Sequence, residues 1–211
     1  MSLTGAINSG ARRVPAWPLY VVGALLPALL LWAGASGLLG VEPVKEIEHR
    51  LGLWALKLIV AGLCITPLRR FAGINLLKYR RAIGVIAFFY VVLHLLAWLV
   101  LDMGLLWAQA LGDIVKRPYI TMGMAGLLLL LPLALTSNDW SLRRLGTARW
   151  RQLHRLTYPA AVAGAVHYLW LVKAWPLAPI LYLAAILALL GLRLIPKTAR
   201  TGANPVRVSL R

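Results

Sequence analysis

The sequence is short of acidic residues and of cysteine, and each shortage excludes a class of protein. Its 211 residues include six Asp and Glu against 23 Lys and Arg, which gives a net charge of +17. The single cysteine, Cys64, lies within an apolar run, so an intramolecular disulfide and a cysteine-rich zinc cluster are both excluded. A Gly-rich dinucleotide fingerprint with its following acidic residue is also missing, which excludes NAD(P)H binding in the Rossmann manner.

The positive charge does not indicate a nucleic-acid-binding protein. Lys and Arg stand in short groups between long apolar runs, and exposed aromatic residues are not interleaved with them. Hydrophobic residues make up 61% of the chain and the mean hydropathy is +0.77, whereas a soluble domain is roughly 45–50% apolar. The excess must face lipid, so we expect an integral membrane protein with the bilayer, and no nucleic acid, among its partners.

Six apolar runs have the length of transmembrane helices. A helix needs about 17–25 apolar residues to cross the hydrocarbon, where each backbone group must be paired within its own segment. We therefore predict an all-α, six-helix membrane bundle over residues 18–195, with a cytoplasmic tail at 1–17 and a disordered cytoplasmic tail at 196–211. The predicted spans are residues 18–39, 51–68, 82–101, 119–136, 157–174 and 177–195.

The basic residues alternate between the two sides of this predicted bundle. Seventeen Lys and Arg fall in the tails and in the loops after the second and fourth spans, and five fall in the other three loops. Because cytoplasmic segments carry the excess of Lys and Arg, both termini are predicted to be cytoplasmic. Five of the six acidic residues fall on the opposite, outer side.

Two of the four histidines lie deep within predicted spans, where an ionisable side chain is costly and marks a functional position by default. His94 lies 13 residues after Arg81, and His167 lies 12 residues after Arg155, on two spans that run in the same direction. At about 1.5 Å per residue, both lie roughly 18–20 Å from the inner boundary. Two imidazoles at one depth are the pair that a bis-histidine haem requires, whereas zinc needs more ligands than this level offers.

The other two histidines have less specific patterns. His154 precedes His167 by 13 residues, which puts it about 20 Å lower and about 140° around a straight helix. Pro159 lies between them and allows a kink. Ligation of a second haem and a plain interfacial position both stay open for His154. For His49, in an outer loop, a surface or partner contact is expected rather than ligation.

Several basic residues are candidates for binding the anionic groups of a cofactor. Lys57 lies in the second span, where it either extends to the outer interface or pairs with a haem propionate. Arg80, Arg81 and Arg151 cluster at the inner face. Topology alone accounts for them, and arginine forks also match the propionates of a lower haem or the phosphate of a flavin.

A series of short stretches carries a family resemblance over about residues 18–195. These stretches are residues 48–49, 52–56, 66–69, 79–84, 87–90, 93–94, 114–121 with Gly123, 131–137, 150–158 and 167–173. In order and spacing they resemble the MsrQ family, also called YedZ.

The resemblance implies the ferric reductase-like transmembrane fold. That superfamily includes NADPH oxidases and metalloreductases, in which two helices carry two histidines each and hold two stacked haems. His94, His154 and His167 match three of those four positions, and the missing fourth is usual in MsrQ-like proteins. The resemblance thus implies haem b, one group or two, with His94 and His167 as iron ligands and His154 as the ligand of a second haem.

The same resemblance implies a role in electron transport. MsrQ is the haem-bearing subunit, in the bacterial inner membrane, of a two-component system whose periplasmic molybdopterin enzyme, MsrP, reduces methionine sulfoxide in proteins. Its electrons come from the quinone pool or from a cytosolic flavin reductase. FMN is sometimes assigned as a second cofactor, and no motif in this sequence places it. Such a chain transfers electrons, and the catalytic reduction belongs to the partner.

Two alternatives stay open. One is another transmembrane haem electron-transfer or metalloreductase subunit. A self-sufficient enzyme of that kind needs a fused flavin and nicotinamide domain, for which 211 residues leave no room. The other alternative is a haem-free small transporter with structural histidines, which predicts a colourless protein where the haem interpretation predicts a red one.

Overall fold

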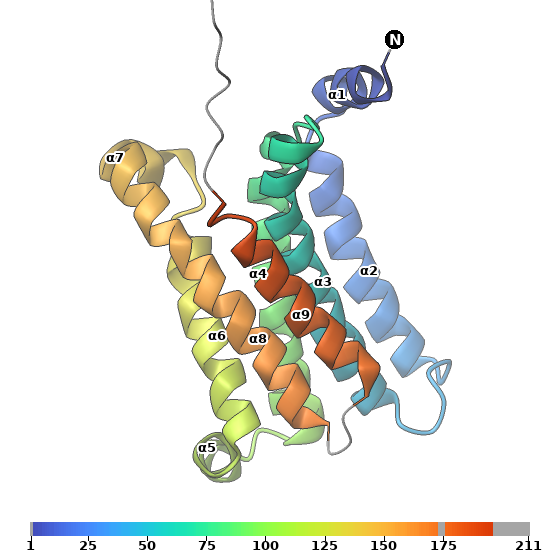
Figure 1. The fold of residues 1–211 in the computed structure, drawn as a ribbon. Helices are drawn as coiled ribbons and strands as arrows, with labels where there is room; N and C mark the ends of the chain where they lie inside the picture. Colours follow the sequence, from blue (N-terminus) through green and yellow to red (C-terminus); the bar gives the residue numbers. More distant parts are fainter. Residues whose placement is uncertain (1, 173–175, 196–211) are drawn as a thin grey trace, which may run out of the picture.

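The computed structural model describes residues 2–172 and 176–195, and every regular element within them is helical (Figure 1). The α-helices are α1 (Leu3–Arg13), α2 (Trp17–Ala35), α3 (Pro43–Phe71), α4 (Arg80–Leu96), α5 (Trp107–Lys116), α6 (Pro118–Leu135), α7 (Asp139–Leu153), α8 (Thr157–Leu171) and α9 (Leu177–Gly191). Three short helical segments, η1 (Leu77–Tyr79), η2 (Ala97–Asp102) and η3 (His154–Leu156), adjoin α4 and α8. The predicted all-α class is confirmed.

Six helices, α2, α3, α4, α6, α8 and α9, form a bundle in which successive helices run in opposite directions (Figure 1). The most extensively packed pairs are α3 with α4 and α6 with α8, and α9 packs on α8. α1, α7 and the last turn of α9 lie at one end of the bundle, called here the α7 end, and α5 lies at the other, the α5 end. This is the six-helix bundle that the apolar runs predict.

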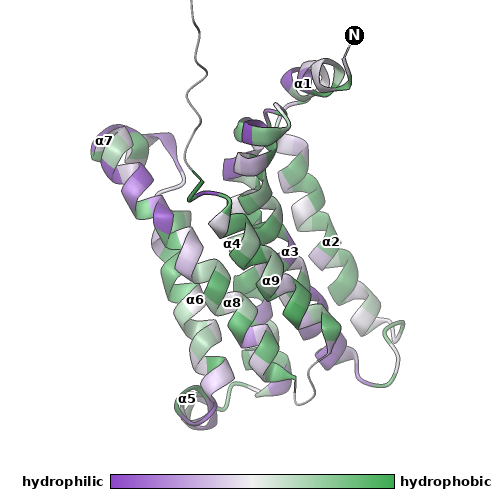
Figure 2. Ribbon diagram, viewed as in Figure 1, coloured by the Kyte–Doolittle hydropathy of each residue, from purple (hydrophilic) through white to green (hydrophobic). Residues whose placement is uncertain are grey.

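Apolar side chains cover the outside of this bundle as well as its inside. By length and composition α2, α3, the continuous stretch Leu77–Asp102 that contains α4, and α6 are each able to cross a membrane. α8 and α9 are shorter, at 15 residues each, and α8 continues directly from η3. In Figure 2 hydrophobic residues follow the helices and many hydrophilic residues gather toward their ends. The chain is therefore a membrane protein whose helices present apolar surface to lipid.

The structure changes some of the predicted boundaries. α3 begins at Pro43, earlier than predicted, because proline suits the first helical turn. The polar first turns of α3 are stabilised further by the ion pair between Glu46 Oε1 and Arg50 Nε, at 2.6 Å. The predicted N-terminal tail contains α1. Residues 173–174 of the predicted fifth span and the predicted tail 196–211 lie outside the described residues.

Small residues bring α6 and α8 together in the middle of the bundle. Ala161 and Ala165 of α8 are fully buried, and a Cβ placed on Gly126 of α6 would already touch the backbone of α8 at 3.7 Å. Leu63 of α3 and Ile186 of α9 belong to the same buried cluster. Close approach through small residues is the usual packing between helices in lipid. It fixes the position of α8, one of the two helices with a deep histidine.

An even number of crossings puts the α1 and α7 segments on one side of the membrane and α5 on the other. In a Cys64→Ser background, Ala6→Cys and Thr147→Cys should react with a membrane-impermeant maleimide from the same side. Gln109→Cys should react only from the opposite side. All three positions are exposed, and Ala6 and Thr147 lie at the α7 end of the bundle, whereas Gln109 lies at the α5 end. Labelling intact spheroplasts and inverted vesicles measures this. Equal labelling of Ala6→Cys and Gln109→Cys from one side would contradict the six-crossing topology.

Candidate functional site

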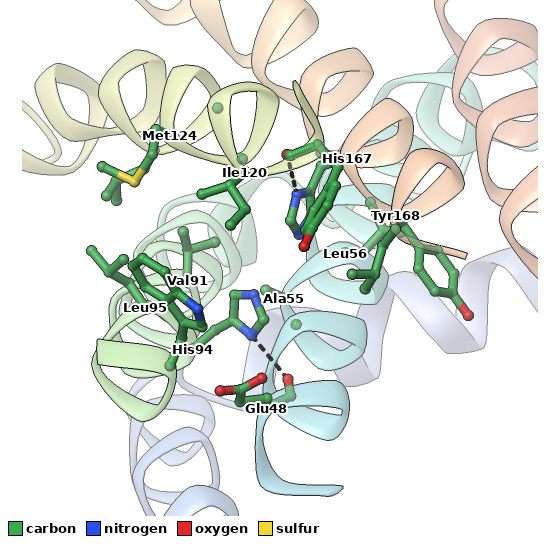
Figure 3. Close-up of a pocket in the computed structure, with 18 of the residues that line it drawn as sticks. Glu48, Ala55, Leu56, Val91, His94, Leu95, Ile120, Met124, His167 and Tyr168 are labelled. Atoms are coloured by element: carbon green, nitrogen blue, oxygen red, sulfur yellow. Dashed lines mark hydrogen bonds between the residues drawn. The ribbon is translucent and has the colours of Figure 1, made fainter. Parts of the chain in front are cut away.

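A cavity opens among α3, α4, α6 and α8, toward the α5 end of the bundle. Its volume is about 420 Å³, within the range of roughly 300–1,000 Å³ that is typical of cofactor sites. Most of its wall is apolar, with side chains such as those of Leu56, Val91 and Ile120 (Figure 3). The charged and polar side chains at its mouth are those of Lys45, Glu48, His49, Asp102 and Arg117.

Two histidines face one another in this cavity (Figure 3). His94 comes from α4 and His167 from α8, and their ring centroids are 6.1 Å apart, with the ring planes at 74°. The structure therefore brings together the two histidines that the sequence spacing puts at one depth.

Each of these imidazoles is held by a backbone carbonyl of a neighbouring helix. His94 Nδ1 lies 2.9 Å from the carbonyl oxygen of Glu48 on α3, and His167 Nδ1 lies 2.6 Å from that of Tyr119 on α6. Since a carbonyl oxygen only accepts, Nδ1 carries the proton in both rings and Nε2 keeps its lone pair. Among the residues that the structure describes, none hydrogen-bonds to Nε2 of either ring. Two nitrogens able to ligate a metal are thus available in one cavity.

A glycine lies against each ring, and its missing side chain provides the space that the ring occupies. A Cβ at Gly52 would lie 3.2 Å from the His94 ring, and a Cβ at Gly123 would lie 2.9 Å from Nδ1 of His167, closer than real Cβ atoms approach. Each glycine follows, by one helical turn, the carbonyl that accepts from the same ring. The sequence reasoning did not assign either glycine to the site.

The helix widens immediately after the histidine of α4. At Leu96 it passes into η2, a π-helical segment (Ala97–Asp102), and both Trp98 and Asp102 of this segment line the cavity. Segments of this kind occur frequently at functional sites, because the wider turn changes the direction of the following side chains. No pattern in the sequence indicated it, and the third span was predicted as one continuous helix.

His154 does not reach this cavity. It lies in η3 near the α7 end, where its ring stacks on Trp150 with centroids 3.7 Å apart and its Nε2 lies 3.2 Å from Thr136 Oγ1. The Thr136 hydroxyl donates to the Pro132 carbonyl at 2.6 Å, so His154 Nε2 is the donor to Thr136. Burial and the arginines at the start of α4 lower the pKa of His154 to about 4, which leaves the ring neutral at pH 7.

The basic residues expected at a cofactor also lie away from the cavity. Lys57 is exposed on α3, which fits an extension toward the membrane interface rather than a contact with a group in the cavity. Arg80 and Arg81 lie at the start of α4, and Arg81 Nη1 pairs with Asp139 Oδ1 at 2.7 Å. Arg151 is exposed and donates from Nε to a backbone carbonyl of α7 at 3.2 Å.

The contact between Gly123 and His167 predicts a selective loss of stability. Gly123→Ala should lower the free energy of unfolding by about 1–3 kcal/mol, because the added methyl group overpacks the ring. Gly84→Ala is the matched control: a Cβ there meets nothing within 4 Å, so the change should be neutral or stabilising by about 0.4–1 kcal/mol. Denaturant unfolding in detergent micelles measures both, and equal stability of the two variants would show that Gly123 is not required for packing.

Bacterial relatives align with nearly the whole chain. The family described as Ferric reductase like transmembrane component matches residues 51–165. The "protein-methionine-sulfoxide reductase heme-binding subunit MsrQ" of Agrobacterium fabrum is 49% identical over 197 residues, which cover 90% of this chain and 91% of the relative. The subunits of the same name from Brucella anthropi and Brucella ovis are 48% and 49% identical, over 87% and 90% of this chain and 83% and 86% of their own. The chain therefore belongs to the ferric reductase-like transmembrane family and, within it, to the MsrQ heme-binding subunits.

Proposed function

We propose that this chain binds one haem b between His94 and His167 and carries electrons across the membrane to a methionine sulfoxide reductase. The observation that carries the proposal is the pair of facing imidazoles, each with its Nδ1 proton held by a carbonyl and its Nε2 free. Two neutral imidazoles from two helices are the axial ligand set of a b-type haem in a helical bundle. The name of the relatives, heme-binding subunit, supports the same group.

The spacing of the two rings fits a metal ion between them. A metal–imidazole bond is about 2 Å long. Two such bonds, added to the distance from the ligating nitrogen to the centroid in each ring, give a centroid separation of about 6 Å. The separation in this structure is 6.1 Å. A zinc site is disfavoured, because the described residues contain no group of three or more His, Cys, Asp or Glu arranged to hold a metal.

The mouth of the cavity offers partners for the two haem propionates. Lys45 and Arg117 line it, and Arg117 is held there by Tyr119 and Asp113, with contacts of 3.1 Å from Nη1 and 3.3 Å from Nε. An arginine and a lysine at the rim of an apolar cavity can pair with the propionate carboxylates of a haem, while its porphyrin ring lies in the cavity. We assign the propionates to these two residues in place of Lys57, which lies outside the cavity.

We assign one haem rather than two. The cavity does not extend to His154, whose Nε2 is already engaged by Thr136 and whose ring face is covered by Trp150. Ligation through Nε2 would require the contact with Thr136 to break. No second histidine lies beside it in the described residues.

When bound, the haem supplies a one-electron carrier, and the chain supplies its position and a dry setting. The two histidines would hold the iron, and the apolar wall would limit the access of water to it. From the alternation of basic residues we infer that the α7 end faces the cytoplasm and the cavity mouth faces the periplasm. The acceptor is then a periplasmic MsrP-like molybdopterin enzyme. The donor is the quinone pool or a cytosolic flavin reductase, with FMN as a further cofactor on the cytoplasmic side.

The haem assignment predicts a specific pattern of pigment loss. The purified protein should be red, with Soret and α bands that sharpen on reduction with dithionite. His94→Ala and His167→Ala should each lose most of the haem, because a single imidazole holds the iron far less tightly than two. His154→Ala is the control and should keep it, because His154 lies outside the cavity. The pyridine haemochrome assay measures the haem content of each variant.

Three outcomes would contradict parts of this assignment. A full haem complement in both His94→Ala and His167→Ala would remove the site. Loss of about half the haem in His154→Ala would establish a second group at the α7 end. A colourless wild-type protein would favour the haem-free transporter.

Electron delivery can be tested across a sealed membrane. In proteoliposomes with NADPH, FMN and a flavin reductase inside, and an MsrP-like enzyme with methionine sulfoxide outside, sulfoxide should be consumed only when this chain is present. Each sulfoxide takes two electrons and two protons and yields methionine and water. His167→Ala should abolish consumption and Arg149→Gln should not. Equal consumption by vesicles without the chain would refute the proposed route.

A further inference from the structure

The α7 end of the bundle carries positive charge that the described residues do not neutralise. All six Asp and Glu lie within the described residues, and five of them lie toward the α5 end. The sixth, Asp139, pairs with Arg81. Arg80 and Arg193, also at the α7 end, form no ion pair with any described residue. Any counter-anion of these two arginines would therefore come from outside the described residues.

The guanidinium of Arg193 is fixed in place by three helices. Arg193 follows α9, and its Nη1 donates to the Tyr158 hydroxyl on α8 at 3.0 Å, while Nη2 donates to the Leu63 carbonyl on α3 at 2.9 Å. The guanidinium also lies over the Tyr158 ring, 4.9 Å from its centroid. Its Nε is buried and has no hydrogen-bond partner among the described residues. An oriented, charged donor is therefore left unused, which costs free energy unless a ligand accepts from it.

A second arginine lies near this group. Arg80 is the first residue of α4, and its charge interacts with that of Arg193 and with Tyr158. The Tyr158 oxygen accepts from Arg193 Nη1, so its own proton remains available for a further acceptor. Two like charges held near one another are unfavourable without an anion between or beside them.

We propose that Arg193, Arg80 and Tyr158 bind a phosphate group at the α7 end of the bundle. A phosphate accepts several hydrogen bonds at once, and its charge offsets two guanidinium groups. The three residues lie where α4 begins, α8 begins and α9 ends. That is the level at which helices leave the apolar region and headgroup phosphates lie. The carrier is either an anionic phospholipid or a soluble phosphate ester, since both present this group.

The proposed phosphate site is separate from the haem site. None of its three residues lines the cavity that contains His94 and His167. The inference does not rest on the haem assignment, and the haem content of each preparation, measured in parallel, keeps the two apart.

The test compares two probes with two variants of the full chain. Native mass spectrometry measures binding of phosphatidylglycerol against phosphatidylcholine, and equilibrium dialysis measures binding of FMN against riboflavin, which lacks the phosphate. Arg193→Gln should weaken binding of the preferred phosphate probe about tenfold or more, because it removes a charge-assisted donor. Arg149→Gln is the matched control: it removes the same charge from an exposed position on α7 and should leave affinity within about twofold.

Each outcome decides the proposal. Selective loss of phosphatidylglycerol binding in Arg193→Gln supports the site with a lipid as its ligand, and selective loss of FMN binding supports it with a soluble ester. Equal affinity of wild type and Arg193→Gln for both probes, or an equal loss in Arg149→Gln, would overturn it. If Arg193→Gln does not fold, Tyr158→Phe keeps the ring and removes the hydroxyl, and unchanged binding by that variant would overturn the proposal as well.

Discussion

The site depends on two hydrogen bonds, one from His94 Nδ1 to the Glu48 carbonyl and one from His167 Nδ1 to the Tyr119 carbonyl. In an apolar surrounding, an N–H group without an acceptor costs about 1–3 kcal/mol, so each ring is held in a single orientation. Because these bonds fix the proton on Nδ1, they also fix Nε2 as the atom with a free lone pair. The tautomer, the ring direction and the ligating atom follow from one contact per histidine.

Each hydrogen bond lies within one of the two most extensively packed helix pairs, α3 with α4 and α6 with α8. In each pair one helix provides the histidine, and the other provides the acceptor carbonyl and, one turn later, Gly52 or Gly123 against the ring. The site therefore consists of two similar halves, each complete within its own pair, and the cavity lies where the pairs meet. A group ligated by both histidines would join the two pairs across that cavity.

Depth along a helix could be predicted from the sequence, whereas direction around it could not. A constant rise per residue sets the levels of His94 and His167, and the structure places their rings together. The same rise per residue correctly places His154 at a different level. Its contacts with Thr136 and with α7 could not be predicted, because no periodicity indicates the kink in α7 at Gly146, where φ is 73°. The sequence likewise placed Lys57 within the second span but could not predict which face of α3 it occupies. Both site glycines lie in the stretches that carry the family resemblance, but no periodicity placed them against the histidine rings.

The two ends of the bundle differ in how their charges are satisfied. At the α5 end three basic residues have an acidic partner on the same helix or turn, in the pairs Lys45–Glu42, Arg50–Glu46 and Arg117–Asp113. Exposed pairs of this kind add little stability, but they leave that end nearly neutral. At the α7 end the described residues form one such pair, between Arg81 and Asp139. The excess of arginine at the α7 end thus leaves unmatched donors at one end of the bundle, where we propose that a phosphate binds, in addition to the propionates proposed at the cavity mouth.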